Sequence, residues 1–214
     1  MTNYPHIDIS MMVRSSLFTA LIIVGAYIRL PIGPVPITLS SFFVLLSPLL
    51  LGKKWSLISV SLYLLLGALG LPVFSAGGGV VLFLGPTGGY LLGYIPAVLV
   101  TALVAGEKRY SVVRTAAGLC KGTVVIYAIG VAWLKLILEI SWPAAVTAGM
   151  VPFLFGDGVK IIAAVAGKTV ILKTAPGLFP LLEKQSSQSR QSSRSRQSNR
   201  SSRIEKSKTR GAVP

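Results

Sequence analysis

Long apolar stretches joined by short connections constrain this chain more than any other feature of its sequence. A helix that crosses a bilayer needs about 20 mostly apolar residues, because each residue adds about 1.5 Å against a hydrocarbon core of about 30 Å. Six segments meet or approach this length, the second being short enough that part of it could be loop: 13–30, 37–52, 56–74, 86–106, 112–138 and 144–172. The sequence therefore predicts an all-α, polytopic membrane protein with six transmembrane helices.

The charged residues agree with this interpretation. Only 13% of the chain is charged, against about a quarter in soluble domains. Arg14 lies at the start of the first segment, further basic residues lie between the second and third segments and between the fourth and fifth, and others follow the sixth. At the other three connections the only basic residue is Arg29, at the end of the first segment. Since positive charge marks the cytoplasmic side, we expect a multi-pass cell-membrane protein with both termini in the cytoplasm.

The end of the chain differs in composition from the rest. Residues 184–214 are rich in Ser, Arg and Gln and hold nine of the 21 Lys and Arg residues. A segment with so few apolar residues cannot bury enough surface to fold. The sequence therefore predicts a transmembrane domain at 1–183 followed by a disordered basic tail. Contact with anionic lipid headgroups is the simplest role for the tail. RNA binding by an Arg/Ser tract is an alternative, but the overall charge does not favour nucleic acid as a partner.

Several kinds of chemistry are excluded or disfavoured. The chain has one histidine, His6, and one cysteine, Cys120, so it holds no Ser-His-Asp triad, no Cys/His metal site and no internal disulfide. Gly167-Lys168-Thr169 resembles the end of a phosphate-binding loop, but Ile162 stands where that loop needs glycine. With acidic residues scarce as well, we expect neither an enzyme nor an ATPase, and uphill transport would need a partner or an ion gradient.

Two opposite charges lie near the middle of the sixth segment. Asp157 and Lys160 are three residues apart and share one helix face. A charge at the bilayer centre costs several kcal/mol unless it is paired or faces a cavity. A structural pair that holds the helix in place is one interpretation, and a polar ligand site is the one we favour. Gly149, Pro152 and Gly156 predict an irregular start to this helix, as occurs where backbone lines a cavity.

Other segments could complete such a site. The Pro-rich stretch 29–39 and the Gly-rich stretch 75–90 lie on the predicted outer side, where they could cap a cavity. At the outer end of the fifth segment, Lys135 and Glu139 have the spacing of a solvated i,i+4 ion pair.

Four blocks, in order, resemble a known family. They are PVPITLS at 34–40, YLLLGALGLPVF at 63–74, GPTGGYLLGY at 85–94 and VPFLFGDGVK at 151–160. Together they resemble the BioY family, the biotin-specific substrate-binding (S) subunits of energy-coupling-factor (ECF) transporters. The resemblance covers roughly residues 13–175 and does not extend to the tail.

The resemblance implies a six-helix S-component bundle that captures biotin from outside. Such subunits dock on a transmembrane coupling protein driven by two ATPase subunits, and they use no cofactor. The family's first helix carries an Ala-x-x-x-Ala-type face toward the coupling protein, to which Ser16 and Ala20 correspond here. A stand-alone biotin facilitator, an S subunit for another vitamin, a membrane enzyme and a scaffold with a functional tail remain alternatives.

Biotin would account for the residues in these blocks. It offers a ureido ring, an apolar thiophane and a carboxylate. Asp157 can accept the ureido N–H groups, Lys160 can meet the ureido oxygen or the carboxylate, and Arg29 can attract the carboxylate. The remaining expected ligand-binding residues supply apolar walls (Tyr63, Phe74, Tyr90) or hydrogen-bond donors (Thr87, Gly88, Gly89).

Overall fold

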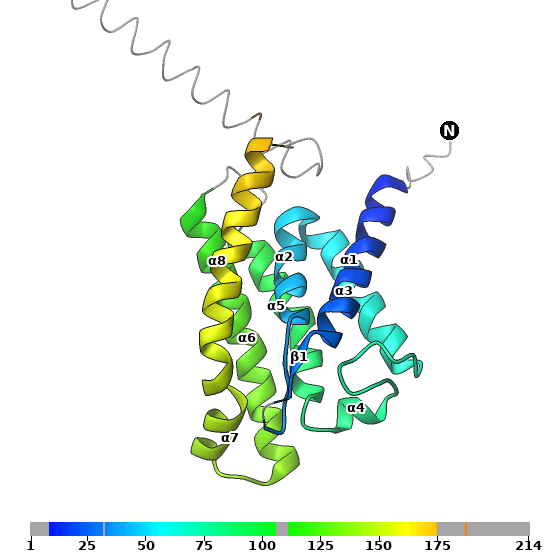
Figure 1. Cartoon of the computed structure of the whole chain (residues 1–214), viewed down its shortest axis with the longest axis vertical. Helices are drawn as coiled ribbons and strands as arrows, with labels where there is room; N and C mark the ends of the chain where they lie inside the picture. Colours follow the sequence, from blue (N-terminus) through cyan, green and yellow to red (C-terminus); the bar gives the residue numbers. More distant parts are fainter. Residues whose placement is uncertain (1–8, 32, 106–110, 175–186, 188–214) are drawn as a thin grey trace, which may run out of the picture.

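A computed structural model of the chain describes residues 9–31, 33–105, 111–174 and 187. This part is mostly helical, with one short hairpin (Figure 1). In chain order the elements are α1 Ile9–Tyr27, β1 Arg29–Leu30, β2 Ile37–Thr38, α2 Ser40–Leu50, α3 Gly52–Ala68, α4 Val81–Leu84, α5 Gly88–Ala105, α6 Val112–Leu138, α7 Trp142–Gly149 and α8 Val151–Thr174. The predicted disordered tail, 184–214, lies outside the described residues apart from Ser187.

Apolar helices of membrane-spanning length make up much of the described chain. Three helices, α1, α5 and α6, are long and apolar enough to cross a bilayer. The pair α7 and α8 passes the same test as one span bent by 41°, which brings the number to four. At 11 and 17 residues, α2 and α3 are shorter than this test requires. The expected total of six spans therefore stays a prediction.

The first predicted helix, 13–30, is displaced in the structure. Helix α1 begins four residues earlier, at Ile9, and ends at Tyr27. Beyond it, Arg29 and Leu30 form β1, which pairs antiparallel with Ile37 and Thr38 of β2. The proline-rich sequence that follows explains why α1 does not continue further. Proline supplies no N–H donor for a helix, and it disfavours helical conformation in the residue before it.

The second and third predicted helices, 37–52 and 56–74, also need correction. The start of the second is strand β2, and its helical part is α2. The helix is interrupted at Gly52, between α2 and α3. Its φ of +82° is a left-handed conformation that favours glycine. Helix α3 therefore starts at Gly52 rather than 56, and it ends at Ala68. The apolar pattern continues past that end because Val73 and Phe74 are buried in a non-helical segment.

The last predicted helix, 144–172, is two helices with a break at Met150. Helix α7 ends at Gly149 and α8 begins at Val151, with Pro152 in its first turn, where proline is tolerated. An irregular start was expected from Gly149, Pro152 and Gly156, and the bend confirms it. The other two predicted helices agree with α5, to within two residues, and with α6, whose bounds are the predicted 112–138.

The two ends of the bundle carry different features. The start of α1, the α2–α3 junction and the end of α8 lie at one end, and the hairpin, α4 and α7 lie at the other (Figure 1). We call the second the hairpin end. Lys135 and Glu139 lie near it, but they form no ion pair with each other. Glu139 adopts a left-handed backbone conformation past the end of α6, while the Lys135 ammonium lies 5.4 Å from the centre of the Trp142 ring.

Hydroxyl groups join α1 to α3 inside the bundle. Ser15 Oγ lies 2.8 Å from Ser59 Oγ, and Thr19 Oγ1 donates to the Ser59 carbonyl at 3.0 Å. These buried contacts fix the rotation of α1. As a consequence Ser16 and Ala20, the expected docking residues, are exposed on its outer face.

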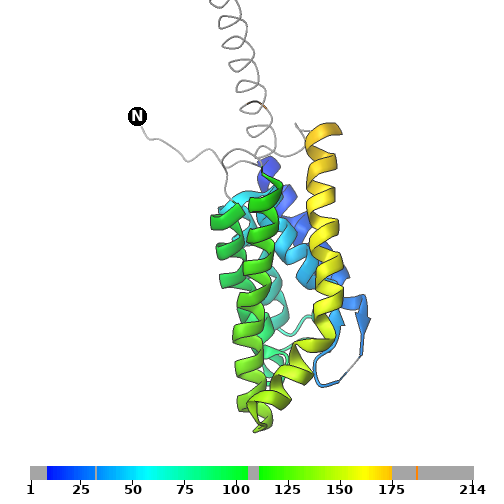
Figure 2. The ribbon, with the colours of Figure 1, turned by 90° about the vertical axis from the view of Figure 1, so that its left-hand side faces the viewer.

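Helix α8 stands apart from the rest of the core. Only Phe153, Ala164 and Lys168 of its 24 residues are buried, and in the side view it lies beside the α5–α6 pair rather than within it (Figure 2). Its apolar contacts with the main core come from a few side chains, Phe153 and Ala164 with Ile161 and Val165 partly buried beside them, so the polar contacts described below add to what holds it against the bundle.

Candidate ligand-binding site

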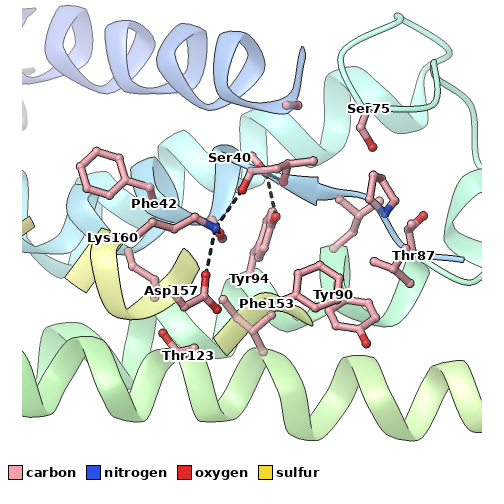
Figure 3. A pocket seen from close by; sticks show the side chains of 18 of the residues that line it. Ser40, Phe42, Ser75, Thr87, Tyr90, Tyr94, Thr123, Phe153, Asp157 and Lys160 are labelled. Carbon is pink, nitrogen blue, oxygen red and sulfur yellow. Dashed lines mark hydrogen bonds and ion pairs between the residues drawn. The ribbon is translucent and has the colours of Figure 1, made fainter. Parts of the chain in front are cut away.

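A cavity toward the hairpin end lies between α2, α5, α6 and α8 (Figure 3). It encloses about 930 Å³ of space between its lining atoms, including the part that opens to the outside. Aromatic side chains from several elements form much of its wall: Phe42, Tyr63, Phe74, Tyr90, Tyr94, Tyr127 and Phe153. Such a wall suits a flat or ring-shaped apolar ligand group.

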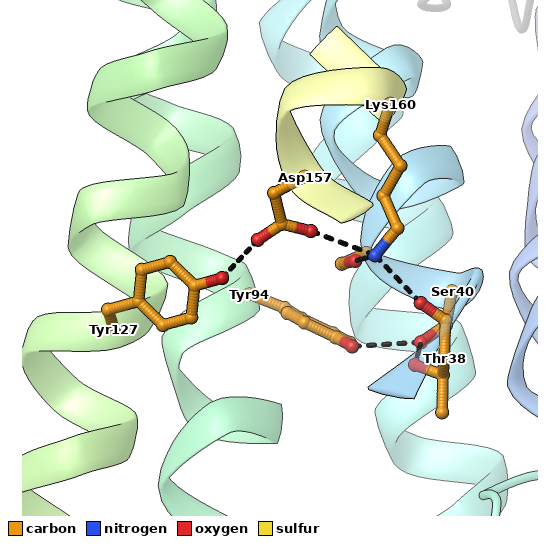
Figure 4. A network of polar contacts seen from close by, with 7 residues as sticks. Thr38, Ser40, Tyr94, Tyr127, Asp157 and Lys160 are labelled. Carbon is orange, nitrogen blue, oxygen red and sulfur yellow. Dashed lines mark hydrogen bonds and ion pairs between the residues drawn. The ribbon is translucent and has the colours of Figure 1, made fainter. Parts of the chain in front are cut away.

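The charged pair of α8 lies in this wall. Lys160 Nζ is 2.9 Å from Asp157 Oδ1, and both side chains are only 15% exposed. The same ammonium donates to the Thr38 carbonyl and to Ser41 Oγ, each at 2.9 Å (Figure 4). An ammonium has three donors, and these three contacts use all of them. Lys160 thus joins α8 to the junction of β2 and α2.

Asp157 has a second partner on another helix. Tyr127 of α6 donates its phenol hydroxyl to Asp157 Oδ2 (Figure 4). Both carboxylate oxygens are therefore hydrogen-bonded, one by an ammonium and one by a phenol. The pair satisfies the condition for charge inside a membrane, namely a partner and a protein-lined surrounding, and it connects α8 with both α2 and α6.

Beside the pair runs a chain of hydroxyl groups. Tyr94 OH lies 2.9 Å from Ser40 Oγ, which lies 2.7 Å from Thr38 Oγ1. The close approach of this segment to α1 holds it in place: the Leu39 amide donates to the Gly25 carbonyl at 3.0 Å. A Cβ on Gly25 would lie 3.0 Å from backbone atoms of Leu39 and Ser40, so a larger residue would displace the segment.

The break between α7 and α8 is tied to α5 by aromatic side chains. Tyr90 OH donates to the Gly149 carbonyl at 2.8 Å, which satisfies a backbone group next to the break. The Tyr90 ring also stacks on Phe153, with ring centres 6.4 Å apart. These contacts place the start of α8, and with it Asp157, against the cavity.

The expected ligand-binding residues divide into two groups. Six of them line the cavity: Tyr63, Phe74, Thr87, Tyr90, Asp157 and Lys160. Arg29, Gly88 and Gly89 do not. Arg29 is exposed and donates to the Ser75 carbonyl, which joins the hairpin to the loop that follows α3. Gly88 and Gly89 are buried at the start of α5, where the helix packs closely on its neighbours.

Several polar residues of the cavity were not among those expected from the sequence. Thr38, Ser40 and Tyr94 lie inside two of the four blocks, so a closer inspection of those blocks could have identified them. Ser41 directly follows the first block. Tyr127 lies in the middle of an apolar helix outside all four blocks, and only the fold brings its hydroxyl to Asp157.

Comparisons with known proteins agree on one family. The model of the BioY family matches residues 1–176. A biotin transporter BioY of Thermotoga maritima is 44% identical over 154 residues, which are 72% of this chain and 90% of that protein. A probable biotin transporter BioY of Pyrococcus horikoshii is 42% identical over 151 residues, 70% of this chain and 88% of its own.

A solved structure agrees with the sequence comparisons. The crystal structure of the S-component for biotin from an ECF-type ABC transporter superposes with a TM-score of 0.71 at 28% identity, over 82% of this chain and 96% of that one. The four blocks, the helical fold and the extent of these matches lead to the same conclusion: the chain belongs to the BioY family.

Proposed function

We propose that this chain captures biotin from the outside and delivers it inward across the cell membrane. One observation carries the proposal: an Asp157–Lys160 pair lies in the wall of a largely aromatic cavity. The family and the names of the relatives, which are biotin transporters, support biotin as the ligand. The function is transport, with biotin as substrate and no chemical change to it.

Asp157 is the residue that we assign to the ureido ring. A carboxylate offers about four lone-pair sites, and the contacts with Lys160 and Tyr127 use two of them. The remaining sites can accept ureido N–H donors. All three N–H donors of Lys160 are hydrogen-bonded to protein groups. The main role of Lys160 in this proposal is therefore to compensate the charge of the carboxylate and hold it in position, and a direct contact with biotin would require it to leave one of these partners.

The rest of the cavity suits the rest of biotin. The rings of Tyr63, Phe74 and Tyr90 provide apolar surface for the thiophane and the valerate chain. Thr87 lies in the wall away from the charged pair, where its hydroxyl could donate to the carboxylate (Figure 3). Arg29, outside the wall, can still attract the carboxylate over several ångströms through its charge.

We also propose a membrane topology of six spans with both termini in the cytoplasm. Six spans with both termini cytoplasmic require α2 and α3 to count as short spans beside the three or four longer ones. The distribution of charge supports this arrangement, because Lys53 and Lys54 lie at the end opposite the hairpin end. Impermeant thiol reagents on intact cells test it in a Cys120→Ser background. Ser75→Cys should react from outside, and Lys53→Cys should react only after the membrane is opened.

We also propose that an ECF coupling protein and two ATPase subunits energise uptake. The structural match to an ECF-type S-component supports this, and Ser16 and Ala20 are exposed and small enough for a partner helix to approach. Uptake in cells that lack the ATPase module separates the alternatives. A driven subunit stops accumulating biotin there, whereas a stand-alone facilitator still equilibrates it.

Direct binding tests the choice of ligand. Purified chain in detergent is titrated with labelled biotin, and unlabelled biotin, thiamine and riboflavin compete. We expect saturable binding that only biotin displaces. Displacement by another vitamin would reassign the substrate within the same fold, and no saturable binding by a monodisperse, helical sample would remove biotin capture as the function.

A further inference from the structure

A second hollow lies on the other side of the Asp157–Tyr127 wall. It is an open groove between α6 on one side and α7 and α8 on the other, with about 1030 Å³ of space, part of it open to the surroundings. Most of its lining is apolar, and Tyr127, Asp157, Thr123 and Ile161 line both this groove and the ligand cavity. The groove is therefore a separate space that shares one wall with the proposed biotin site.

The length of the groove matches one leaflet of a membrane. Along α6 it extends from Cys120 to Ala132. At about 1.5 Å per residue, these 12 steps cover about 18 Å. Half of a hydrocarbon core of about 30 Å is about 15 Å. A single acyl chain that enters from the hairpin end would fill the groove to its inner end near the bilayer centre.

The outer end of the groove carries groups that suit a lipid headgroup. Trp142 lines the groove there and is half exposed, as tryptophan commonly is at the membrane interface. The Lys135 ammonium lies over this ring and forms no ion pair with Glu139. A cation in this position can meet a phosphate oxygen while the ring borders the glycerol region.

From these three features we infer that the groove is a binding site for one phospholipid of the leaflet at the hairpin end. Its acyl chain occupies the space between α6 and α8, and its phosphate meets Lys135. Because α8 buries few side chains in the protein, the acyl chain supplies apolar contacts that the core does not. The groove shares one wall with the proposed biotin site, but it takes a lipid rather than a vitamin.

Lipid retention measured by native mass spectrometry tests the inference. The full chain is purified in a mild detergent, and phosphatidylglycerol or phosphatidylethanolamine is added back after delipidation. Ala128 is exposed and lines the groove, so Ala128→Trp fills it without displacing core side chains. Ala163→Trp is the matched control, because Ala163 is exposed on α8 outside both hollows.

A second pair of variants tests the headgroup contact. Lys135→Ala removes the proposed phosphate partner, and Lys53→Ala removes a cation at the opposite end of the bundle. We expect the unmodified chain to retain one phospholipid, Ala128→Trp to lose it and Ala163→Trp to keep it. Lys135→Ala should weaken retention of either lipid about fivefold, the effect of one exposed charge contact, and Lys53→Ala should not.

Three outcomes would overturn the inference. They are an unmodified chain that retains no phospholipid, equal retention by Ala128→Trp and the unmodified chain, and equal losses in the two tryptophan variants. The last would indicate general annular lipid rather than a site. Elution as a single species and unchanged helical content show that each variant is folded, so loss of lipid cannot be attributed to unfolding.

Discussion

Removing the ammonium of Lys160 is the perturbation with the largest expected effect on biotin binding. Lys160→Met keeps most of the side-chain length and deletes three 2.9 Å contacts, to Asp157, the Thr38 carbonyl and Ser41. The Asp157 carboxylate, which is only 15% exposed, then keeps Tyr127 as its remaining described partner. Its charge is then uncompensated and its position is no longer fixed by Lys160, so it is no longer held where it is proposed to accept the ureido N–H groups.

The magnitude follows from the burial of the pair. Both side chains are 15% exposed, so solvent screens them little. Breaking a buried pair by removing one partner costs about 3–5 kcal/mol, and each 1.4 kcal/mol is a tenfold change in affinity. Part of this cost is also present in the unliganded variant. We therefore take the lower end and expect the Kd for biotin to rise by about 100-fold.

Isothermal titration of biotin into purified chain measures the effect. Lys173→Met serves as the matched control, since Lys173 is exposed in the last turn of the same helix. Asp157→Asn should lose a similar amount, and the double variant should lose less than the sum of the two single losses because the residues act as one pair. A Kd for Lys160→Met or Asp157→Asn within about twofold of the unmodified chain would refute the assignment of the pair to the ligand site.

Three further predictions concern other parts of the account. Tyr127→Phe removes the phenol contact to Asp157 and should weaken biotin binding about tenfold without loss of folding, as titration would show; an unchanged Kd would exclude a role for this hydroxyl. Gly25→Ala should lower unfolding stability by about 1–3 kcal/mol, because its Cβ would meet backbone atoms at 3.0 Å, whereas Gly167→Ala, with nothing within 4 Å, should raise stability by about 0.5–1 kcal/mol. Thermal unfolding in detergent measures both, and equal effects would contradict the packing described. Deleting residues 184–214 should leave biotin affinity unchanged, and a lost affinity would assign the tail a role in binding.

The approximate positions of the helices could be predicted from hydrophobicity. The residues at which a helix begins and ends could be predicted only where strong local features mark them. The bounds of α6 agree with the prediction because its apolar stretch starts after a charged connection and holds no proline. The third segment was extended six residues beyond Ala68. Its last residues are apolar because Val73 and Phe74 face the core, and hydrophobicity alone does not distinguish buried loop from helix.

The site shows a similar division. Asp157 and Lys160 could be identified because charge inside an apolar helix is costly and needs an explanation. Their contacts could not, since Thr38 meets Lys160 through its backbone carbonyl rather than its side chain, and Tyr127 lies outside every recognised block. Arg29 was expected at the ligand because it is the only basic residue of the three outer connections. In the structure its side chain instead joins the hairpin to Ser75, so its place depends on loop geometry that no sequence pattern encodes.

A structure of the purified chain with biotin bound, determined by crystallography or electron microscopy, tests the central claim most directly. The account predicts ligand density in the cavity between α2, α5, α6 and α8, with ureido nitrogens within hydrogen-bond distance of the Asp157 carboxylate and the thiophane against the ring of Tyr90 or Tyr63. Biotin density elsewhere on a chain that binds it, with this cavity empty, would contradict the account.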